Sequence, residues 1–327
     1  MMRQRATYVD ASVADTSAHA AVHVEDFSKS YGETPAVRSL SFTVERGTLY
    51  GLIGPDGAGK TTTMRTLVTL LRPDNGVINV CGQDVLRGVT AIRSVVGYMP
   101  QRFSLYPDLS VDQNLTFFAD LFGVPATEVA SRKQRLYTFS RLEPFAQRLA
   151  GRLSGGMKQK LALSCTLIHD PELLVLDEPT TGVDPVSRNE FWTILRELTA
   201  DGVTIIVSTP YMDEALRCDR VLVMHEGRAL AEGDPVLLAR NFALPVFAVH
   251  DPDLVLRGVT DLTATDPRIL GVHSFGESLH ITAEAATTLE DVRCAAQKAF
   301  GRSIDVEQID ATLEDVFIHL IGARRDS

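Results

Sequence analysis

Hydrophobic and polar residues alternate along the first part of the chain, from about residue 21 to residue 44. The alternation is visible in the segments His23–Phe27 and Leu40–Val44. Strands that bury one face and expose the other have this pattern. The segment is therefore predicted to form half-exposed antiparallel strands.

From Leu49 to about Gly233, short apolar runs alternate with stretches of helical periodicity. The runs Leu49–Ile53, Leu173–Leu176 and Val203–Val207 contain almost only apolar residues. Strands buried on both faces have this composition, which is typical of parallel sheets that lie between helices. We therefore predict an α/β fold with a buried parallel sheet for this region.

The two ends of the chain differ from this central region. Asp234-Pro235 follows it, and residues 234–327 contain none of the phosphate motifs described below. We predict that these residues form a separate small α+β domain. Residues 1–20 have no continuous apolar segment and carry Asp10 and Asp15, so we expect a disordered tail rather than a targeting signal.

Two helices can be located from their capping residues. Ser110 and Gln113 have the spacing of a capping box, and Thr312 can cap a helix near the C-terminus. The first helix would have an apolar face at Leu115, Phe118 and Phe122, and the second at Leu313, Val316, Phe317 and Leu320. Each face could pack on the chain's own core or dock on another protein.

The overall composition narrows the possible classes of protein. Of 327 residues, 45% are hydrophobic and 23% charged, which excludes a fibrous or disordered chain. The net charge of -10 argues against a groove for nucleic-acid phosphates, so no nucleic-acid partner is expected. No apolar stretch approaches the ~18 residues of a membrane span, so a membrane role would require a partner. The four cysteines are far apart, which disfavours structural zinc or a disulfide scaffold.

A glycine-rich segment after the first buried run carries the most specific chemistry. Gly54-Pro55-Asp56-Gly57-Ala58-Gly59-Lys60-Thr61 fits the phosphate-loop pattern G-x-x-x-x-G-K-[ST]. A helix is predicted to open at Thr61-Thr62, with Met64, Leu67 and Leu71 on one side, and to end near Pro73. The glycines let backbone N–H groups converge on phosphate oxygens at the positive end of the helix dipole. Lys60 would neutralise the β and γ phosphates and Thr61 would bind Mg²⁺.

A pair of acids follows the second buried run. Leu173–Leu176 leads directly into Asp177 and Glu178, at the strand end where open α/β sheets bind their ligands. Asp177 would hold Mg²⁺, directly or through water, and Glu178 would polarise the water that attacks the γ phosphate. The alternative for this segment alone is a strand that ends in a solvated acidic turn.

Upstream of these acids lies Leu153-Ser154-Gly155-Gly156-Met157. A helix that begins at this Ser-Gly-Gly turn would form a second anion site. With the two elements above, the segment resembles the signature motif of ATP-binding cassette (ABC) ATPases, although Met157 replaces the commoner glutamine. In that family, the motif binds the γ phosphate of ATP held by the opposite subunit.

The remaining family motifs follow in order. Tyr31 matches the aromatic residue that stacks on adenine, Gln101 the Q-loop glutamine that touches Mg²⁺ and water, and Asp184 the D-loop aspartate at the dimer interface. The resemblance covers about residues 21–233. It implies a P-loop ABC cassette with a RecA-like core, an antiparallel β subdomain and a helical subdomain at about 102–160.

The resemblance also implies a set of functional residues. The catalytic residues would be Lys60, Gln101 and Glu178, and the Mg²⁺ ligands would be Thr61, Gln101 and Asp177. ATP would contact Tyr31, the loop residues Gly54, Pro55, Asp56, Gly57, Ala58, Gly59, Lys60, Thr61 and Thr62, and, from the opposite subunit, Ser154, Gly155, Gly156 and Asp184.

Together with Leu313-Glu314-Asp315-Val316-Phe317, this arrangement is similar to the ATPase subunits of bacterial multidrug or lipid-type exporters. It implies an ATPase that powers amphiphile efflux by ATP-driven dimer closure. The partners would be polytopic membrane permease subunits and a second cassette, identical or different. The protein would lie in the cytoplasm, on the cytoplasmic face of the cell membrane, and residues 234–327 would be an accessory or regulatory domain.

One residue departs from the family pattern. Pro210 stands where a histidine usually follows the third buried run. A proline is structurally suitable here, because it favours the first position of a helix, with Thr209 as the cap. It cannot, however, donate a hydrogen bond to the γ phosphate as a histidine would. Losing one such donor typically lowers the rate by about 10²–10³. We therefore expect ATP binding with slow hydrolysis.

Two other functions remain open at this stage. A soluble ABC ATPase that acts on ribosomes or DNA is disfavoured, because the chain has one cassette and no coiled-coil insertion. A regulatory ATP-binding subunit that assists a second cassette is favoured by Pro210 but disfavoured by the intact Lys60, Asp177 and Glu178.

Overall fold

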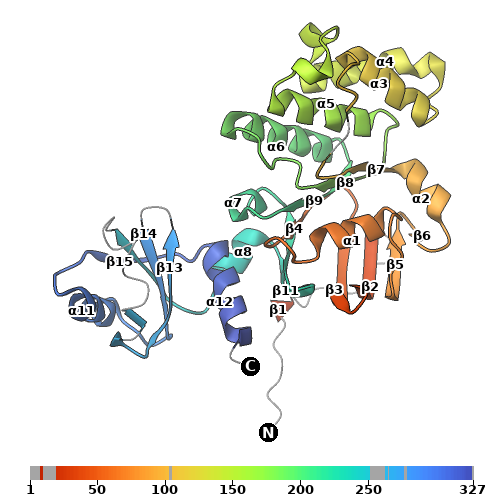
Figure 1. The fold of residues 1–327 in the computed structure, drawn as a ribbon. Coiled ribbons are helices and arrows are strands. Elements are labelled where there is room, and N and C mark those ends of the chain that lie inside the picture. The colour runs from red at the N-terminus through yellow and green to blue at the C-terminus, as the bar shows by residue number, and fades with distance from the viewer. Residues whose placement is uncertain are drawn as a thin grey trace. The chain divides into compact units, whose positions relative to one another are not determined.

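The structure, a computed structural model, describes residues 8–9, 20–102, 105–250, 262–263, 265–275 and 278–325. The chain divides into two compact units, Met1–Gly233 and Asp234–Ser327. In Figure 1 the colour follows the chain from red at the N-terminus to blue at the C-terminus.

A seven-stranded sheet forms the centre of the first unit, in the order β1-β11-β10-β4-β9-β8-β7. Its strands are β1 (Tyr8–Val9), β4 (Leu49–Ile53), β7 (Val96–Met99), β8 (Leu173–Asp177), β9 (Thr204–Thr209), β10 (Arg220–His225) and β11 (Arg228–Gly233). The five strands β10, β4, β9, β8 and β7 run parallel. All residues of β4, β8 and β9 are buried, so the predicted parallel sheet with two covered faces is confirmed.

A second sheet in this unit is antiparallel, in the order β3-β2-β5-β6. Its strands are β2 (Ala20–Tyr31), β3 (Thr34–Glu45), β5 (Asn75–Val80) and β6 (Gln83–Asp84). The predicted antiparallel pair over residues 21–44 is therefore confirmed. Phe27, Leu40 and Phe42 pack with Leu52 and Met64 in one buried cluster, which anchors this sheet on the phosphate loop's strand and helix.

The helices of the first unit are α1 (Lys60–Leu67), α2 (Val89–Val95), α3 (Val111–Leu121), α4 (Ala126–Ser140), α5 (Gly155–Leu167), α6 (Pro185–Ala200) and α7 (Met212–Ala215), with short 3₁₀ turns at Glu143–Phe145 and Ala150–Arg152. In Figure 1, α3, α4 and α5 gather in one helical group on the side of β7. The predicted capping box of α3 is confirmed by reciprocal bonds between Ser110 and Gln113. On the predicted apolar face, Leu115 is buried and Phe122 is exposed.

Two details of the first unit differ from expectation. The helix predicted to reach Pro73 is wrong at its end: α1 stops at Leu67, because Thr69 adopts a φ of +61° and Leu70 N–H bonds back to Arg65 O. In the segment expected to be a tail, Tyr8 and Val9 pair with β11. The rest of residues 1–19 lies outside the described residues.

The second unit contains an antiparallel sheet in the order β13-β14-β12-β15. Its elements are α8 (Pro235–Arg240), β12 (Val246–His250), β13 (Ile269–Phe275), β14 (Ser278–Ala283), α11 (Leu289–Phe300), β15 (Val306–Ile309) and α12 (Leu313–Arg325). Helical residues 262–263 lie between β12 and β13, which gives a β-α-β-β-α-β order. The predicted α+β class of this unit is confirmed.

Two further expectations concern membranes and cysteines. Within the described residues, no helix is both long and apolar enough to cross a bilayer. Cys81, Cys165, Cys218 and Cys294 are all free, and the middle two are buried.

A buried carboxylate fixes α12 on the sheet of the second unit. Asp315 Oδ2 accepts a hydrogen bond from Thr312 N–H (2.8 Å), and Thr312 Oγ1 accepts one from Asp315 N–H (3.2 Å), as predicted for a helix start. Asp315 Oδ1 lies 3.0 Å from Nδ1 of His280 on β14. Burial alone would raise the pKa of Asp315, but the bonds from His280 and Thr312 outweigh it and lower the pKa. The carboxylate therefore stays ionised and links helix to sheet.

We expect Asp315→Ala to loosen α12 selectively. The substitution removes the cap and leaves a buried imidazole N–H without its acceptor, which together cost about 1–3 kcal/mol. Hydrogen–deuterium exchange over residues 313–322 should accelerate about tenfold or more. Asp305→Ala, at an exposed carboxylate of the same unit, is the control. Equal exchange in the two variants would contradict this account.

Candidate functional site

The phosphate loop turns tightly between β4 and α1. A Cβ on Gly54 would lie 2.2 Å from Met224 O, and one on Gly59, where φ is +99°, would lie 2.6 Å from Ala36 O. Backbone blocks both positions, so only glycine fits them. No side chain caps α1, whereas Ser154 caps α5 and Asp184 caps α6. The first N–H groups of α1 thus remain available to an anion.

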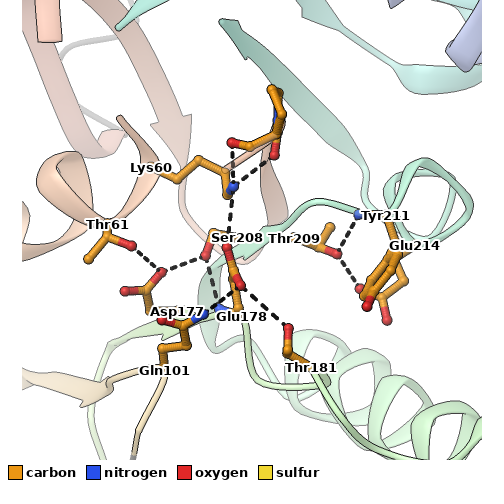
Figure 2. A network of polar contacts seen from close by, with 12 residues as sticks. Lys60, Thr61, Gln101, Asp177, Glu178, Thr181, Ser208, Thr209, Tyr211 and Glu214 are labelled. Carbon is orange, nitrogen blue, oxygen red and sulfur yellow. Dashed lines mark hydrogen bonds and ion pairs between the residues drawn. The ribbon is translucent and has the colours of Figure 1, made fainter. Parts of the chain in front are cut away.

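Lys60 lies inside this loop with 4% of its surface exposed. Its Nζ donates to Gly54 O (2.7 Å) and Pro55 O (3.0 Å), and lies 3.3 Å from Glu178 Oε1. Figure 2 shows this ammonium group between the loop carbonyls and the glutamate. Among the described residues, Lys60 therefore forms its ion pair with the acid expected to be catalytic.

Asp177 ends β8 and joins three elements of the site. Its Oδ1 accepts hydrogen bonds from Thr61 Oγ1 (3.1 Å) and from Ser208 Oγ at the end of β9 (2.8 Å). Its Oδ2 is buried and has no hydrogen-bond partner among the described residues. Burial raises the pKa of Asp177, against the opposing effect of the two hydroxyl donors. A cation beside Oδ2 would satisfy the free oxygen and favour the ionised carboxylate.

Glu178 follows Asp177 directly but leaves the backbone geometry of a strand, and its carboxylate binds other side chains than Asp177 does. Its φ is +48°, and its N–H donates to Ser208 Oγ (3.0 Å). Gln101, just after β7, donates to Glu178 Oε2 (2.8 Å), and Thr181 Oγ1 lies 3.4 Å from the same oxygen. The structure therefore brings Lys60, Gln101 and Glu178 together, with the carboxylate held at both oxygens.

The turn after β9 differs from the prediction. The strand continues through Thr209, which pairs with Ile53, and α7 begins at Met212, so the expectation that Pro210 opens the helix is wrong. Thr209 Oγ1 accepts from Tyr211 N–H (3.1 Å) and donates to Glu214 Oε2 (2.5 Å), which holds the chain extended there.

Glu214 is the second anchor of this turn, with only 1% of its surface exposed. Its Oε1 accepts from Thr180 Oγ1 (2.7 Å) and lies 3.5 Å from Arg188 Nε on α6. The Arg188 guanidinium also lies over the Tyr211 ring, at 4.7 Å. Figure 2 places Tyr211 beside Glu214 and away from Lys60, so its ring does not replace the missing histidine.

The other predicted residues lie apart from this cluster. Tyr31 is half exposed at the tip of the β2–β3 hairpin, whose returning strand touches Gly59 through Ala36. Ser154 and Asp184 stand at the starts of α5 and α6, where both are exposed. Within the part of the chain that the structure describes, no hydrogen bond or ion pair links Ser154 or Asp184 to Lys60 or Glu178.

Sequence reasoning missed Ser208 and Glu214. Ser208 could have been found from the sequence by aligning the ends of the two buried runs as adjacent parallel strands. That alignment places Ser208 beside Asp177, and the two residues are indeed partners in the sheet. Glu214 follows no pattern that separates it from the neighbouring Asp213. Its burial depends on Thr180 and Arg188, which lie far away in the sequence.

The donor set suits Mg²⁺ and a triphosphate. No group of three or more His, Cys, Asp or Glu residues that could hold a metal occurs in the part of the chain that the structure describes. Mg²⁺ needs no such group, because it binds through one or two carboxylates, a hydroxyl and substrate phosphates. The free Asp177 Oδ2 and the Thr61 hydroxyl fit this chemistry.

Comparisons with known proteins agree with the geometry. Residues 37–181 match the sequence profile of the ABC transporter family. The chain is 42% identical over 290 residues to the probable multidrug ABC transporter ATP-binding protein YbhF of Escherichia coli, covering 89% of this chain and 50% of YbhF. It thus spans about half the length of that relative. It is 40% identical to the Nod factor export ATP-binding protein I of Ralstonia nicotianae, covering 91% of this chain and 93% of that one.

Solved structures show the same fold. The cbiO1 protein of Clostridium perfringens, described as part of the ABC transporter complex cbiONQ, aligns with a TM-score of 0.62 and 29% identity over 67% of this chain and 90% of its own. The predicted ABC cassette fold is therefore confirmed. Since the phosphate loop, the acid pair and a full-length relative at 40% identity agree, the chain belongs to the ABC transporter family, among its ATP-binding proteins.

Proposed function

We propose that this chain binds and hydrolyses ATP to power an ABC exporter, working as one of two cassettes that close on ATP. The observation that carries the proposal is the contact group of Lys60, Gln101 and Glu178 beside an uncapped helix start. A structural ion pair would need no glycine loop around it. A triphosphate site needs the loop, the lysine and the acid together.

Each residue of this group has a task. Lys60 exchanges its loop carbonyls for phosphate oxygens and neutralises their charge. Gln101 holds Glu178 Oε2, so that the carboxylate can take a proton from the attacking water. Asp177 and Thr61 would hold Mg²⁺, and a bound Mg²⁺ would supply positive charge beside the phosphates.

The second half of the pocket comes from another cassette. Gly155 lies at the start of α5 and has no positive φ, and nothing lies within 4 Å of a Cβ built there. Alanine has the higher helix propensity, so no backbone angle or side-chain contact among the described residues accounts for a glycine here. ATP bound to a second cassette would explain the glycine, because its γ phosphate would need the space beside the start of α5. Ser154 and Gly155 would then face that γ phosphate.

The proposed role in transport is based on the names of two related proteins. YbhF is named a probable multidrug ABC transporter protein, and the Ralstonia relative a Nod factor export protein. We propose an amphiphilic cargo, polytopic permease partners and a place on the cytoplasmic face of the membrane. The names and the complete acid pair favour a motor over a purely regulatory subunit, so we take Pro210 to affect rate alone.

The proposal is tested by Glu178→Gln. Turnover should fall by about 10²–10⁴ because the general base is lost, while ATP binding persists. With ATP and Mg²⁺ the variant should form a stable dimer, measured by analytical ultracentrifugation. Glu197→Gln, on the exposed side of α6, is the control and should turn over normally. A chain that neither retains labelled ATP nor dimerises would refute the proposed function.

Gly155→Ala separates dimer closure from nucleotide binding. In the Glu178→Gln background, the added methyl has no described atom of its own chain within 4 Å, so the thermal midpoint and ATP binding should be unchanged. ATP-induced dimerisation should weaken by at least about tenfold, because the methyl occupies space meant for the opposing phosphate. Undiminished dimerisation would show that α5 does not face a second nucleotide.

Pro210→His tests the effect of the missing donor. Turnover at saturating ATP should rise by about 10²-fold, because one preorganised hydrogen bond is restored. Pro210→Ala is the matched control, since it removes the ring without adding a donor, and it should stay slow. A rate for Pro210→His no higher than that of the original chain would remove Pro210 as the cause of slow hydrolysis.

A further inference from the structure

Gly156, the second glycine of the signature turn, has a different neighbour from Gly155. It is buried, and a Cβ built on it would lie 2.3 Å from Ser187 Oγ and 2.4 Å from Ser187 Cβ. The nearest backbone atom, Ser187 Cα, would be 3.7 Å away, which is ordinary contact. The obstacle is therefore the Ser187 side chain alone. α5 approaches α6 this closely because one helix has no side chain there and the other has a small one.

Ser187 is itself fixed in the first turn of α6. Its N–H donates to Oδ1 of Asp184, the cap of that helix (2.9 Å). Three residues further along α6, Glu190 Oε2 lies 2.5 Å from Nζ of Lys160, which is four residues beyond Gly156. The two helix starts are thus joined at two successive turns, first by close packing and then by an ion pair.

These two helix starts carry the residues that the proposed function directs to the opposite cassette. Ser154 caps α5 and Asp184 caps α6, and both are exposed. A ligand gripped between two chains requires both groups in fixed relative positions, because misplacement by about 1 Å can cost about 10² in rate. Gly156 lies two residues after Ser154, and Ser187 lies three residues after Asp184, so their contact is close to both caps.

We propose that Ser187 is a positioning residue, which seats the signature helix on α6 so that Ser154 and Asp184 are presented to the second cassette as one rigid unit. The inference rests on the proposed function for the identity of that ligand. Ser187 acts through Gly156 and through the Asp184 loop, and does not need to touch ATP itself.

The packing is tested by a suppressor experiment on the full chain. Gly156→Ala should lower the thermal midpoint by about 2–10 °C, because the methyl meets a filled space. Adding Ser187→Gly should restore most of the loss, since only the Cα then remains, at 3.7 Å. Val186→Gly is the matched control in the same helix turn: that side chain is 69% exposed, and its removal should restore nothing.

The positioning role is tested by a second readout in the Glu178→Gln background. Gly156→Ala should reduce ATP-induced dimerisation by at least about tenfold while labelled ATP still binds the monomer, and Ser187→Gly should recover it. If Gly156→Ala alone does not fold, recovery of folding and dimerisation in the double variant carries the same information.

The outcomes distinguish the positioning role of Ser187 from the proposed function of the chain. If Ser187→Gly and Val186→Gly restore stability equally, or neither does, the contact is not what fixes the helices and the inference is overturned. If stability recovers but dimerisation does not, Ser187 supports packing alone and the positioning role is overturned. If the Glu178→Gln reference itself fails to dimerise with ATP, the proposed function fails, whatever the stability measurements show.

Discussion

The hydrogen bond from Ser208 to Asp177 joins the ends of two adjacent parallel strands, and the polar site is built around this junction. The same hydroxyl oxygen accepts the N–H of Glu178. One serine thereby orients both acids, the first toward Thr61 and the second toward Lys60 and Gln101. Without it, Asp177 would be a buried carboxylate with a single donor, which the apolar surroundings of β8 would not tolerate.

Two adjacent acids can have different tasks because the chain leaves the strand between them. A strand alternates its side chains, but the φ of +48° at Glu178 turns the second carboxylate across the mouth of the phosphate loop. This conformation is costly for a residue other than glycine. It is held by the turn that follows, where Thr180 bonds the buried Glu214 and so connects the acid pair to the end of β9 and to α6.

Much of this arrangement could be predicted from the sequence, because it depends on local signals. Buried strands, the glycine loop and the capping boxes each follow from a few neighbouring residues, and strand order places loop and acids at one edge. The predictions were wrong where contacts between residues far apart in the sequence determine the local structure. The helix after β9 begins at Met212 because Glu214 binds Thr180 and Thr209, and α1 ends early because the chain reverses at Thr69. The pairing of Tyr8 with β11 likewise has no local signature.

Because the start of α1 has no side-chain cap, the stability of the fold should depend on the concentration of a ligand that binds there. Its first amide groups have no side-chain cap, and the neighbouring ammonium is satisfied by carbonyls of its own loop. A molecule that binds only the native state adds a stabilisation that grows with the logarithm of its concentration, about 2.7 kcal/mol at a hundredfold excess over Kd. If the site takes ATP as proposed, cellular nucleotide would protect the cassette against unfolding. Purification that strips nucleotide away would remove this protection while leaving every residue in place.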